Sequence, residues 1–294
     1  MSAYVTAFAD VLQEAFGPLG WMPIPDGELH RFYVPGDSRG TTNGWYVLFL
    51  DGIPAGVYGT WKDGETKKWC ARQPASRGEA RQVSELVREA IRFREAAKAK
   101  EQRLAAERAN RLWYEARKAD GQHRYLDRKR IEPYTLRQTG ETLYVPLYGE
   151  GLLVNLQQIP PYGKKRFLKA GRIKGCYSPL GQPEPGKPLY VCEGFATGAT
   201  IHAETGATVA CAMSAYNLLS VGRYLQHRYP RSSLIIAGDD DRKAASEGKS
   251  NAGVEYATKA AQELGCAMVF PDFPPEAPLE LSDFNDLAVW RATK

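Results

Sequence analysis

The sequence of 294 residues predicts an α/β fold in which a largely parallel sheet is flanked by helices. Three observations support this class. From residue 189 onward, short apolar segments alternate with helix-like ones. Residues 77–118 are rich in Ala, Glu, Arg and Lys, without proline and with no glycine after Gly78. The first 75 residues show aromatic strand patterns punctuated by glycine, which are typical of a small α+β module.

We therefore expect four consecutive parts. Residues 1–75 form a small α+β N-terminal module with nucleic-acid binding as a candidate role, and residues 76–120 form a basic helical connector. A basic α+β subdomain follows over 121–187, and the α/β domain with the parallel sheet occupies 188–294.

The N-terminal module is expected to begin with an amphipathic helix over 3–16 and to continue with strands over 30–34, 45–50 and 55–61. Asp51 and Gly52 favour a hairpin turn between the last two strands. The aromatic side chains of this module have two interpretations, the core of a small sheet or a stacking surface for bases. They are Trp45, Tyr46, Tyr58, Trp61 and Trp69.

The long helix predicted over 77–118 has apolar positions near helical spacing in its first half and a surplus of Lys and Arg. It is either a solvated connector or a surface that touches nucleic acid. Beyond it, strand patterns occur at residues 143–147, 152–156, 189–192, 208–211, 234–237 and 267–270.

Charge is distributed unevenly along the chain. Residues 121–187 contain 12 Lys and Arg against 5 Asp and Glu, whereas residues 188–294 contain 9 against 13. A basic part followed by an acidic one suits a protein that holds a phosphate backbone beside a divalent metal. The alternative is that the surface charge is uneven without any role in ligand binding.

The five cysteines are scattered, with no Cys-x-x-Cys pair, so we expect reduced thiols and no zinc site. No leader-like segment and no apolar run of membrane-spanning length occurs, so we expect a cytoplasmic protein without a membrane partner.

Carboxylates stand at the ends of two predicted core strands. Glu193 follows the strand over 189–192, and Asp239, Asp240 and Asp241 follow the strand over 234–237. Ligands collect at the carboxyl ends of strands in such sheets. Four carboxylates in two neighbouring loops would repel one another unless a cation lay between them.

These motifs resemble the Toprim domain shared by bacterial-type primases, topoisomerases and some nucleases. Residues 193–198 (Glu-Gly-Phe-Ala-Thr-Gly) are similar to its glutamate loop, and residues 237–241 (Ala-Gly-Asp-Asp-Asp) to its Asp-x-Asp loop. Residues 282–287 (Ser-Asp-Phe-Asn-Asp-Leu) are similar to a signature of phage and plasmid primases.

The preceding residues narrow the resemblance to primases. Residues 125–131, 143–147, 156–159 and 163–168 are similar to the basic N-terminal subdomain of the primase catalytic core, which topoisomerases and nucleases lack. The resemblance implies that 121–187 is this subdomain and that 188–294 is the Toprim catalytic domain. Residues 29–32 and 43–46 resemble, more loosely, the leader of mobile-element primases without a zinc ribbon.

The resemblance implies two Mg²⁺ or Mn²⁺ ions, with Glu193, Asp239 and Asp241 as catalytic residues and metal ligands. Two ions held by hard oxygen ligands suit the attack of a 3′-hydroxyl on an α-phosphate. Asp283 and Asp286 are further candidate metal ligands. Asp240 is a weaker candidate, because its side chain points away from its neighbours if the loop is extended. Seven cations are expected to bind nucleotide and template phosphates: Lys129, Lys164, Lys165, Arg166, Lys169, Arg172 and Lys174.

The implied function is a DNA primase of a phage, plasmid or integrated element, which makes short RNA primers on single-stranded DNA from nucleoside triphosphates. A replicative helicase is a candidate partner. Two alternatives stay open: a Toprim nuclease that cleaves nucleic acid with the same carboxylates, and a non-catalytic Toprim protein that binds nucleic acid or inhibits replication.

Overall fold

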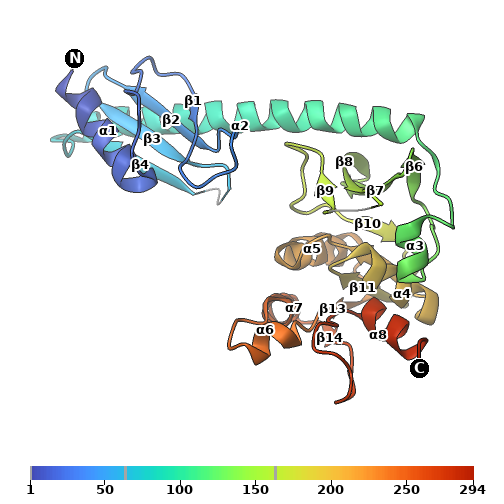
Figure 1. Cartoon of the computed structure of the whole chain (residues 1–294). Coiled ribbons are helices and arrows are strands. Elements are labelled where there is room, and N and C mark those ends of the chain that lie inside the picture. The colour runs from blue at the N-terminus through green and yellow to red at the C-terminus, as the bar shows by residue number, and fades with distance from the viewer. Residues whose placement is uncertain (1, 63–64, 162–163) are drawn as a thin grey trace. The chain divides into compact units, whose positions relative to one another are not determined.

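The computed structural model describes residues 2–62, 65–161 and 164–294, and Figure 1 shows its elements. The chain divides into two compact units, Met1–Lys100 and Glu101–Lys294. Gly163, which belongs to one of the primase-like stretches, lies outside the described residues.

The first unit is a four-stranded antiparallel sheet with a helix on each face. Its strands follow one another in the order β1 (His30–Phe32), β2 (Gly44–Phe49), β3 (Ala55–Thr60) and β4 (Thr66–Cys70). The predicted helix is confirmed as α1 (Ala3–Phe16), whose apolar side packs on one face of the sheet. The first part of α2 (Arg77–Glu115) packs on the other face.

The aromatic side chains of this unit lie mainly in its core. Trp45, Tyr46 and Tyr58 are all buried, at 0 %, 2 % and 8 % exposure. Of the two interpretations that the sequence left open for these three rings, the core interpretation is therefore correct. A buried ring has no free face for a base.

Helix α2 confirms the long helix expected over 77–118, but it ends at Glu115. It ends there because Arg117–Lys118 form β5, a short strand that pairs with β6 (Arg137–Thr139). The helix contributes to both units, since the division falls after Lys100. None of the described helices is both long and apolar enough to cross a membrane.

The second unit begins with an antiparallel sheet of five strands in the order β5-β6-β7-β8-β9. Its centre is the long hairpin of β7 (Thr142–Gly149) and β8 (Leu152–Ile159), and β9 (Arg166–Phe167) lies at an edge. Apolar side chains from the C-terminal part of α2 pack with Tyr144 and Leu156 of this hairpin. A short helix, α3 (Arg124–Lys129), precedes the hairpin.

The second sheet of this unit has the order β10-β12-β11-β13-β14. Its four parallel strands are β11 (Pro188–Cys192), β12 (Thr208–Cys211), β13 (Ser233–Ala237) and β14 (Ala267–Val269), and β10 (Ser178–Leu180) pairs antiparallel at one edge. The predicted class, an α/β domain with a largely parallel sheet, is confirmed.

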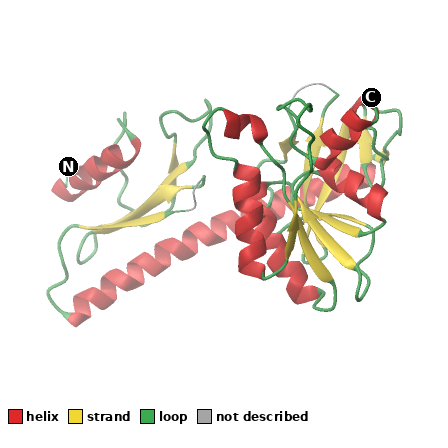
Figure 2. Ribbon diagram, turned by 90° about the horizontal axis from the view of Figure 1, so that it is seen from below, coloured by secondary structure: helices red, strands yellow, loops and turns green. Residues whose placement is uncertain are grey.

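Helices cover both faces of the parallel sheet, as Figure 2 shows. Strand β11 explains the continuous apolar runs, because its alternate side chains are buried on opposite faces. Leu189 and Val191 pack with α5 (Leu218–Arg228) and α7 (Ala252–Leu264). Cys192 packs with α4 (Phe195–Thr205) in a core that also includes Leu143 and Val145 of the antiparallel sheet. One core thus joins the two sheets.

Candidate metal centre

Glu193 and the Asp239–Asp241 loop leave the parallel sheet side by side. Strands β11 and β13 are parallel neighbours, and Cys192 lies opposite Ala237 in their register. Glu193 therefore follows β11 at the level where Gly238 and Asp239 follow β13. The edge at which they meet is the carboxyl end of the sheet, as the sequence predicted.

The Asp239–Asp241 loop is fastened to the first turn of α7 by Asn251. Its Nδ2 donates to Asp240 Oδ1 (2.8 Å), and its Oδ1 accepts from the backbone N–H groups of Asp241 (3.0 Å) and Val254 (3.2 Å). Asn251 is thus the N-cap of α7 and a clamp for the loop. This clamp engages Asp240 Oδ1, and the weaker ligand role expected for Asp240 stays a prediction.

Gly253 allows α7 to approach the loop closely. A Cβ at this position would clash with the backbone carbonyl of Asp239. The backbone N–H of Gly253 also lies 3.3 Å from Asp241 Oδ2, to which it donates. The first turn of α7 therefore sets the position of both Asp239 and Asp241.

Asp283 and Asp286 lie at the N-terminus of α8 (Phe284–Arg291). Asp283 is the N-cap, and its Oδ1 accepts from the Asp286 N–H at 2.7 Å. The Asp286 carboxylate accepts from Lys129 Nζ at 2.8 Å and from the Ser282 N–H at 3.3 Å. Ser282 in turn accepts the Asp240 N–H through its carbonyl at 2.7 Å, which links the start of α8 to the Asp loop.

The neighbouring carboxylates have a strong effect on the pKa of Asp239. Burial, followed by the charges of four neighbouring carboxylates, raises the pKa of Asp239 to about 8. These neighbours are Glu193, Asp283, Asp241 and Asp286. The other four predicted metal ligands thus lie close enough to Asp239 for their charges to act on it.

Glu193 is held by backbone from a neighbouring segment. Burial raises the pKa of its carboxyl, although a hydrogen bond from the Ala215 N–H works to lower it. Ala215 begins η1 (Ala215–Asn217), the short helix that follows β12. This donor is a backbone group far along the chain, so no motif could have indicated it.

The cluster is chemically suited to a divalent cation. Oδ1 of Asp239 is buried without a hydrogen-bond partner, which costs free energy unless a ligand satisfies it. Carboxylate oxygens are the donors that Mg²⁺ and Mn²⁺ prefer. Among the described residues, however, no three His, Cys, Asp or Glu side chains already stand in metal-holding geometry.

The predicted cations fall into three groups. Lys129 is paired with Asp286, with both side chains 23 % exposed. Burial works to lower the pKa of the Lys129 ammonium, but Asp283 and Asp286 outweigh it and raise this pKa. Arg172 donates to Cys176 Sγ (3.2 Å) and Glu150 Oε1 (3.3 Å), which engages it within its own subdomain. The third group is exposed and comprises Lys164, Lys165, Arg166, Lys169 and Lys174.

Lys165 is an exposed cation whose charge acts on the Glu193 carboxyl. Burial raises the pKa of Glu193, and the charge of Lys165 works against this rise. Its Nζ also lies 5.1 Å from the centroid of the Tyr125 ring. Lys165 lies at the start of the basic run, residues 164–174, so the charge of this run acts on the carboxylate cluster.

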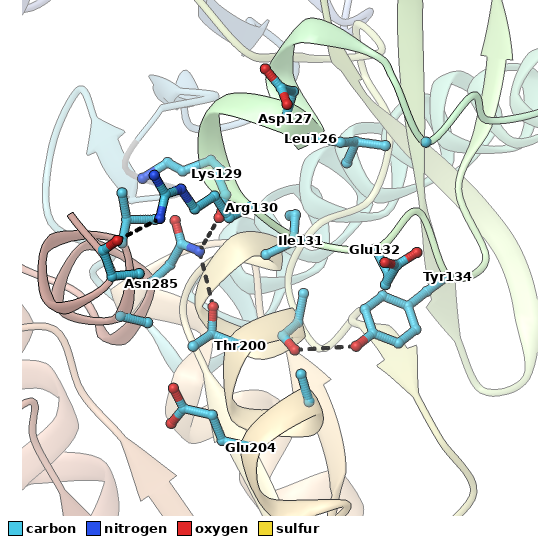
Figure 3. Close-up of a pocket in the computed structure, with 16 residues that line it drawn as sticks. Leu126, Asp127, Lys129, Arg130, Ile131, Glu132, Tyr134, Thr200, Glu204 and Asn285 are labelled. Carbon is cyan, nitrogen blue, oxygen red and sulfur yellow. Dashed lines mark hydrogen bonds between the residues drawn. The ribbon is translucent and has the colours of Figure 1, made fainter.

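A cavity of about 540 Å³ lies between α3, α4 and α8, next to this cluster but distinct from it. Figure 3 shows that Asn285 joins its walls, since Nδ2 donates to the Lys129 carbonyl (2.7 Å) and to Thr200 Oγ1 (2.9 Å). None of the five carboxylates belongs to the described lining. Asn285 stands inside the motif that the sequence indicated, but its role of joining α8 to α3 and α4 did not follow from the motif.

The fold and its carboxylate edge define the class of this domain, and residues 188–293 match the Toprim domain family. The chain is 33 % identical over 266 residues to a DNA primase TraC of Escherichia coli and 31 % identical over 269 residues to a second one. The predicted resemblance to Toprim DNA primases of the mobile-element type is confirmed.

These matches cover 86 % and 88 % of this chain but only 18 % and 25 % of the two relatives. The chain therefore spans a quarter or less of the length of the curated relatives that it matches.

Two solved structures show weaker likeness, each at 14 % identity. One is the complex of bacteriophage T7 lagging-strand DNA polymerase with primase domains (TM-score 0.38, 53 % of this chain and 76 % of that chain). The other is the Aquifex aeolicus primase with its zinc-binding and RNA polymerase domains (TM-score 0.41, 99 % and 85 %). Scores this low support no conclusion about fold or function.

Proposed function

We propose that the chain is the catalytic part of a DNA primase that makes short RNA primers on single-stranded DNA, for replication of a phage, plasmid or integrated element. The observation that carries this proposal is the cluster of five carboxylates around the unpaired Asp239 oxygen, with a basic run beside it. The similarity to the TraC primases over most of this chain supports it.

Glu193, Asp239 and Asp241 would hold the divalent ions, with Asp283 as a further ligand. When bound, Mg²⁺ or Mn²⁺ supplies a more acidic attacking hydroxyl and neutralises the leaving pyrophosphate. Asp286 accepts from Lys129 through Oδ1 and from the Ser282 N–H through Oδ2, so we assign it to orienting this edge of the cluster, with a ligand role through the lone pairs that these bonds leave free. Glu193, with its raised pKa, is a ligand or the proton acceptor from the 3′-hydroxyl.

The exposed cations of the basic run would bind the phosphates of nucleotide and template. Lys165 is the strongest candidate, because its charge acts on the Glu193 carboxyl. Lys164, Arg166, Lys169 and Lys174 would follow the strand outward. For Arg172 and Lys129 we propose an indirect role, because both side chains have carboxylate or thiol partners within the protein.

The experiment is a primer synthesis assay with single-stranded DNA, labelled nucleoside triphosphates and Mg²⁺ or Mn²⁺. We expect the wild-type chain to make di- and oligonucleotides and Glu193→Gln to make fewer by at least about a hundredfold. The exposed Glu184 offers a matched control, and Glu184→Gln should keep wild-type activity. Absence of product from the wild type with every metal and template, or full activity of Glu193→Gln, would refute the proposal. Cleavage of the template instead of synthesis would indicate the nuclease.

A further inference from the structure

A pair of tyrosines, Tyr216 and Tyr256, lies beside the carboxylate cluster. Tyr216 of η1 is 72 % exposed. Its ring centroid lies 4.3 Å from that of Tyr256 on α7, with the two planes tilted by 54°. One exposed aromatic side chain is ordinary on a protein surface. The position of this pair is what distinguishes it.

The two tyrosines stand on the two segments that hold the carboxylates. Tyr216 lies three residues after Met213, whose N–H donates to the Glu193 carbonyl at 2.7 Å. Tyr256 lies in the helix whose first turn holds the Asp239–Asp241 loop through Asn251 and Gly253. The pair therefore connects both carboxylate loops and presents the outer Tyr216 ring to solvent.

The backbone at the end of the basic run is attached to the same segment. Asn217, which is 4 % exposed, accepts from the Gly175 N–H at 2.8 Å and donates to the Ile173 carbonyl at 3.0 Å. These two bonds attach the end of the basic run to η1. Lys174, between the two bonded residues, is exposed. An aromatic face beside a cation is the combination that binds single-stranded nucleic acid, because bases stack while phosphates pair.

We propose that Tyr216, supported by Tyr256, is a stacking platform for an unpaired base of the DNA strand that enters the carboxylate cluster, with Lys174 facing a phosphate of that strand. The inference rests on the proposed function and specifies its template contact. A strand suits this surface better than a free nucleotide does. The Tyr216 ring is open to solvent, and the cations extend over residues 164–174, farther than one triphosphate requires.

The test is the binding of a short fluorescent oligo(dT), followed by anisotropy in EDTA and without nucleotides, so that neither metal nor catalysis contributes. Tyr216→Ala should weaken binding by about tenfold, the usual effect of losing one base–aromatic stack. Tyr216→Phe keeps the ring and should bind within about twofold of wild type. Tyr114 on α2 is 87 % exposed, and Tyr114→Ala is the matched control, expected to bind as wild type does.

The inference is overturned if Tyr216→Ala binds oligo(dT) as tightly as wild type, or if the wild type binds none. It is also overturned if the variant keeps strand binding but loses affinity for a nucleoside triphosphate, since the base would then belong to the nucleotide. The primer assay separates the two proposals. If the wild type binds strands through Tyr216 but makes no primer, only the proposed primase function is refuted. If the wild type makes primers and Tyr216→Ala binds strands unchanged, only the stacking role of Tyr216 is refuted.

Discussion

At the scale of single residues, Asp239 is the carboxyl whose pKa the cluster raises most clearly. Burial, and then the charges of the other four carboxylates of the cluster, raise the pKa of Asp239 to about 8. The unfolded chain would ionise this group near pH 3.8. Between these two values the folded protein binds a proton that the unfolded chain does not, so stability in the absence of metal falls as pH rises.

The first prediction follows from this linkage. In EDTA, the melting temperature of the wild type should fall between pH 5 and pH 8, and Asp239→Asn should remove most of that fall, because the amide does not ionise. Differential scanning fluorimetry at the two pH values measures it. The exposed Asp272 provides the control, and Asp272→Asn should behave as wild type. An equally steep fall in Asp239→Asn would show that this carboxyl does not control the pH response.

The second prediction concerns metal. Cations compete with the proton for the Asp239 carboxylate, so Mg²⁺ should raise the melting temperature by several degrees at pH 8 and by less at pH 5. A shift of about 2–4 °C corresponds to about 1 kcal/mol in a unit of this size. Asp239→Asn should reduce the gain at pH 8. An equal gain at both pH values would contradict binding at this cluster.

At the scale of elements, α7 positions the Asp239–Asp241 loop through Asn251. The third prediction separates its two roles. Asn251→Ala loses the cap and the clamp, which should cost about 1 kcal/mol of stability and weaken Mg²⁺ binding by at least about tenfold. Asn251→Ser restores a good cap but lacks the longer amide group whose Nδ2 donates to Asp240, so stability should return while Mg²⁺ affinity stays low. Calorimetric titration with Mg²⁺ measures the affinity. Wild-type affinity in both variants would exclude the clamp.

The sequence predicts elements well where one segment carries the whole signal. The continuous apolar runs of β11 and β13 are read correctly because both faces of these strands are buried. Helix α1 follows from its apolar spacing. The sequence does not predict β4, β5, β6, β9 and β10. Four of these have only two or three residues, too few for a period-2 pattern, and β10 exists through its pairing with the distant β12.

The candidate site likewise contains residues that the sequence indicates and residues that it does not. The five carboxylates could be selected from sequence because they follow core strands or stand in a short motif. The groups that position these carboxylates could not be selected from sequence, because only the fold brings them next to the carboxylates. Ala215 contributes a backbone N–H to Glu193, and Lys129 reaches Asp286 from 157 residues away in the chain. The register between β11 and β13, which sets Glu193 beside Asp239, also has no local signal.

At the scale of the whole molecule, the chain contains two compact units. In the second, Leu143 and Val145 of the antiparallel sheet share one core with Cys192 and Phe195 of the Toprim domain. The basic run and the carboxylates are therefore held by a common core, although they lie far apart in the sequence. The contacts of the cluster described above all come from residues of this second unit.

The fourth prediction follows from this arrangement. A fragment of residues 101–294 should fold with a cooperative thermal transition and keep the Mg²⁺-dependent rise in melting temperature at pH 8. The matched fragment with Asp239→Asn controls for unspecific effects of the ion. A fragment that folds cooperatively but shows no Mg²⁺ response would mean that residues 1–100 contribute to the metal site.

The metal centre is tested most directly by a crystal structure of the chain with Mn²⁺ and a nucleoside triphosphate, in which anomalous scattering locates the metal. We expect Mn²⁺ at ligand distance from Glu193 and Asp239, with the triphosphate directed toward Lys165. Mn²⁺ bound elsewhere, with the Asp239 carboxylate still without a partner, would contradict this expectation.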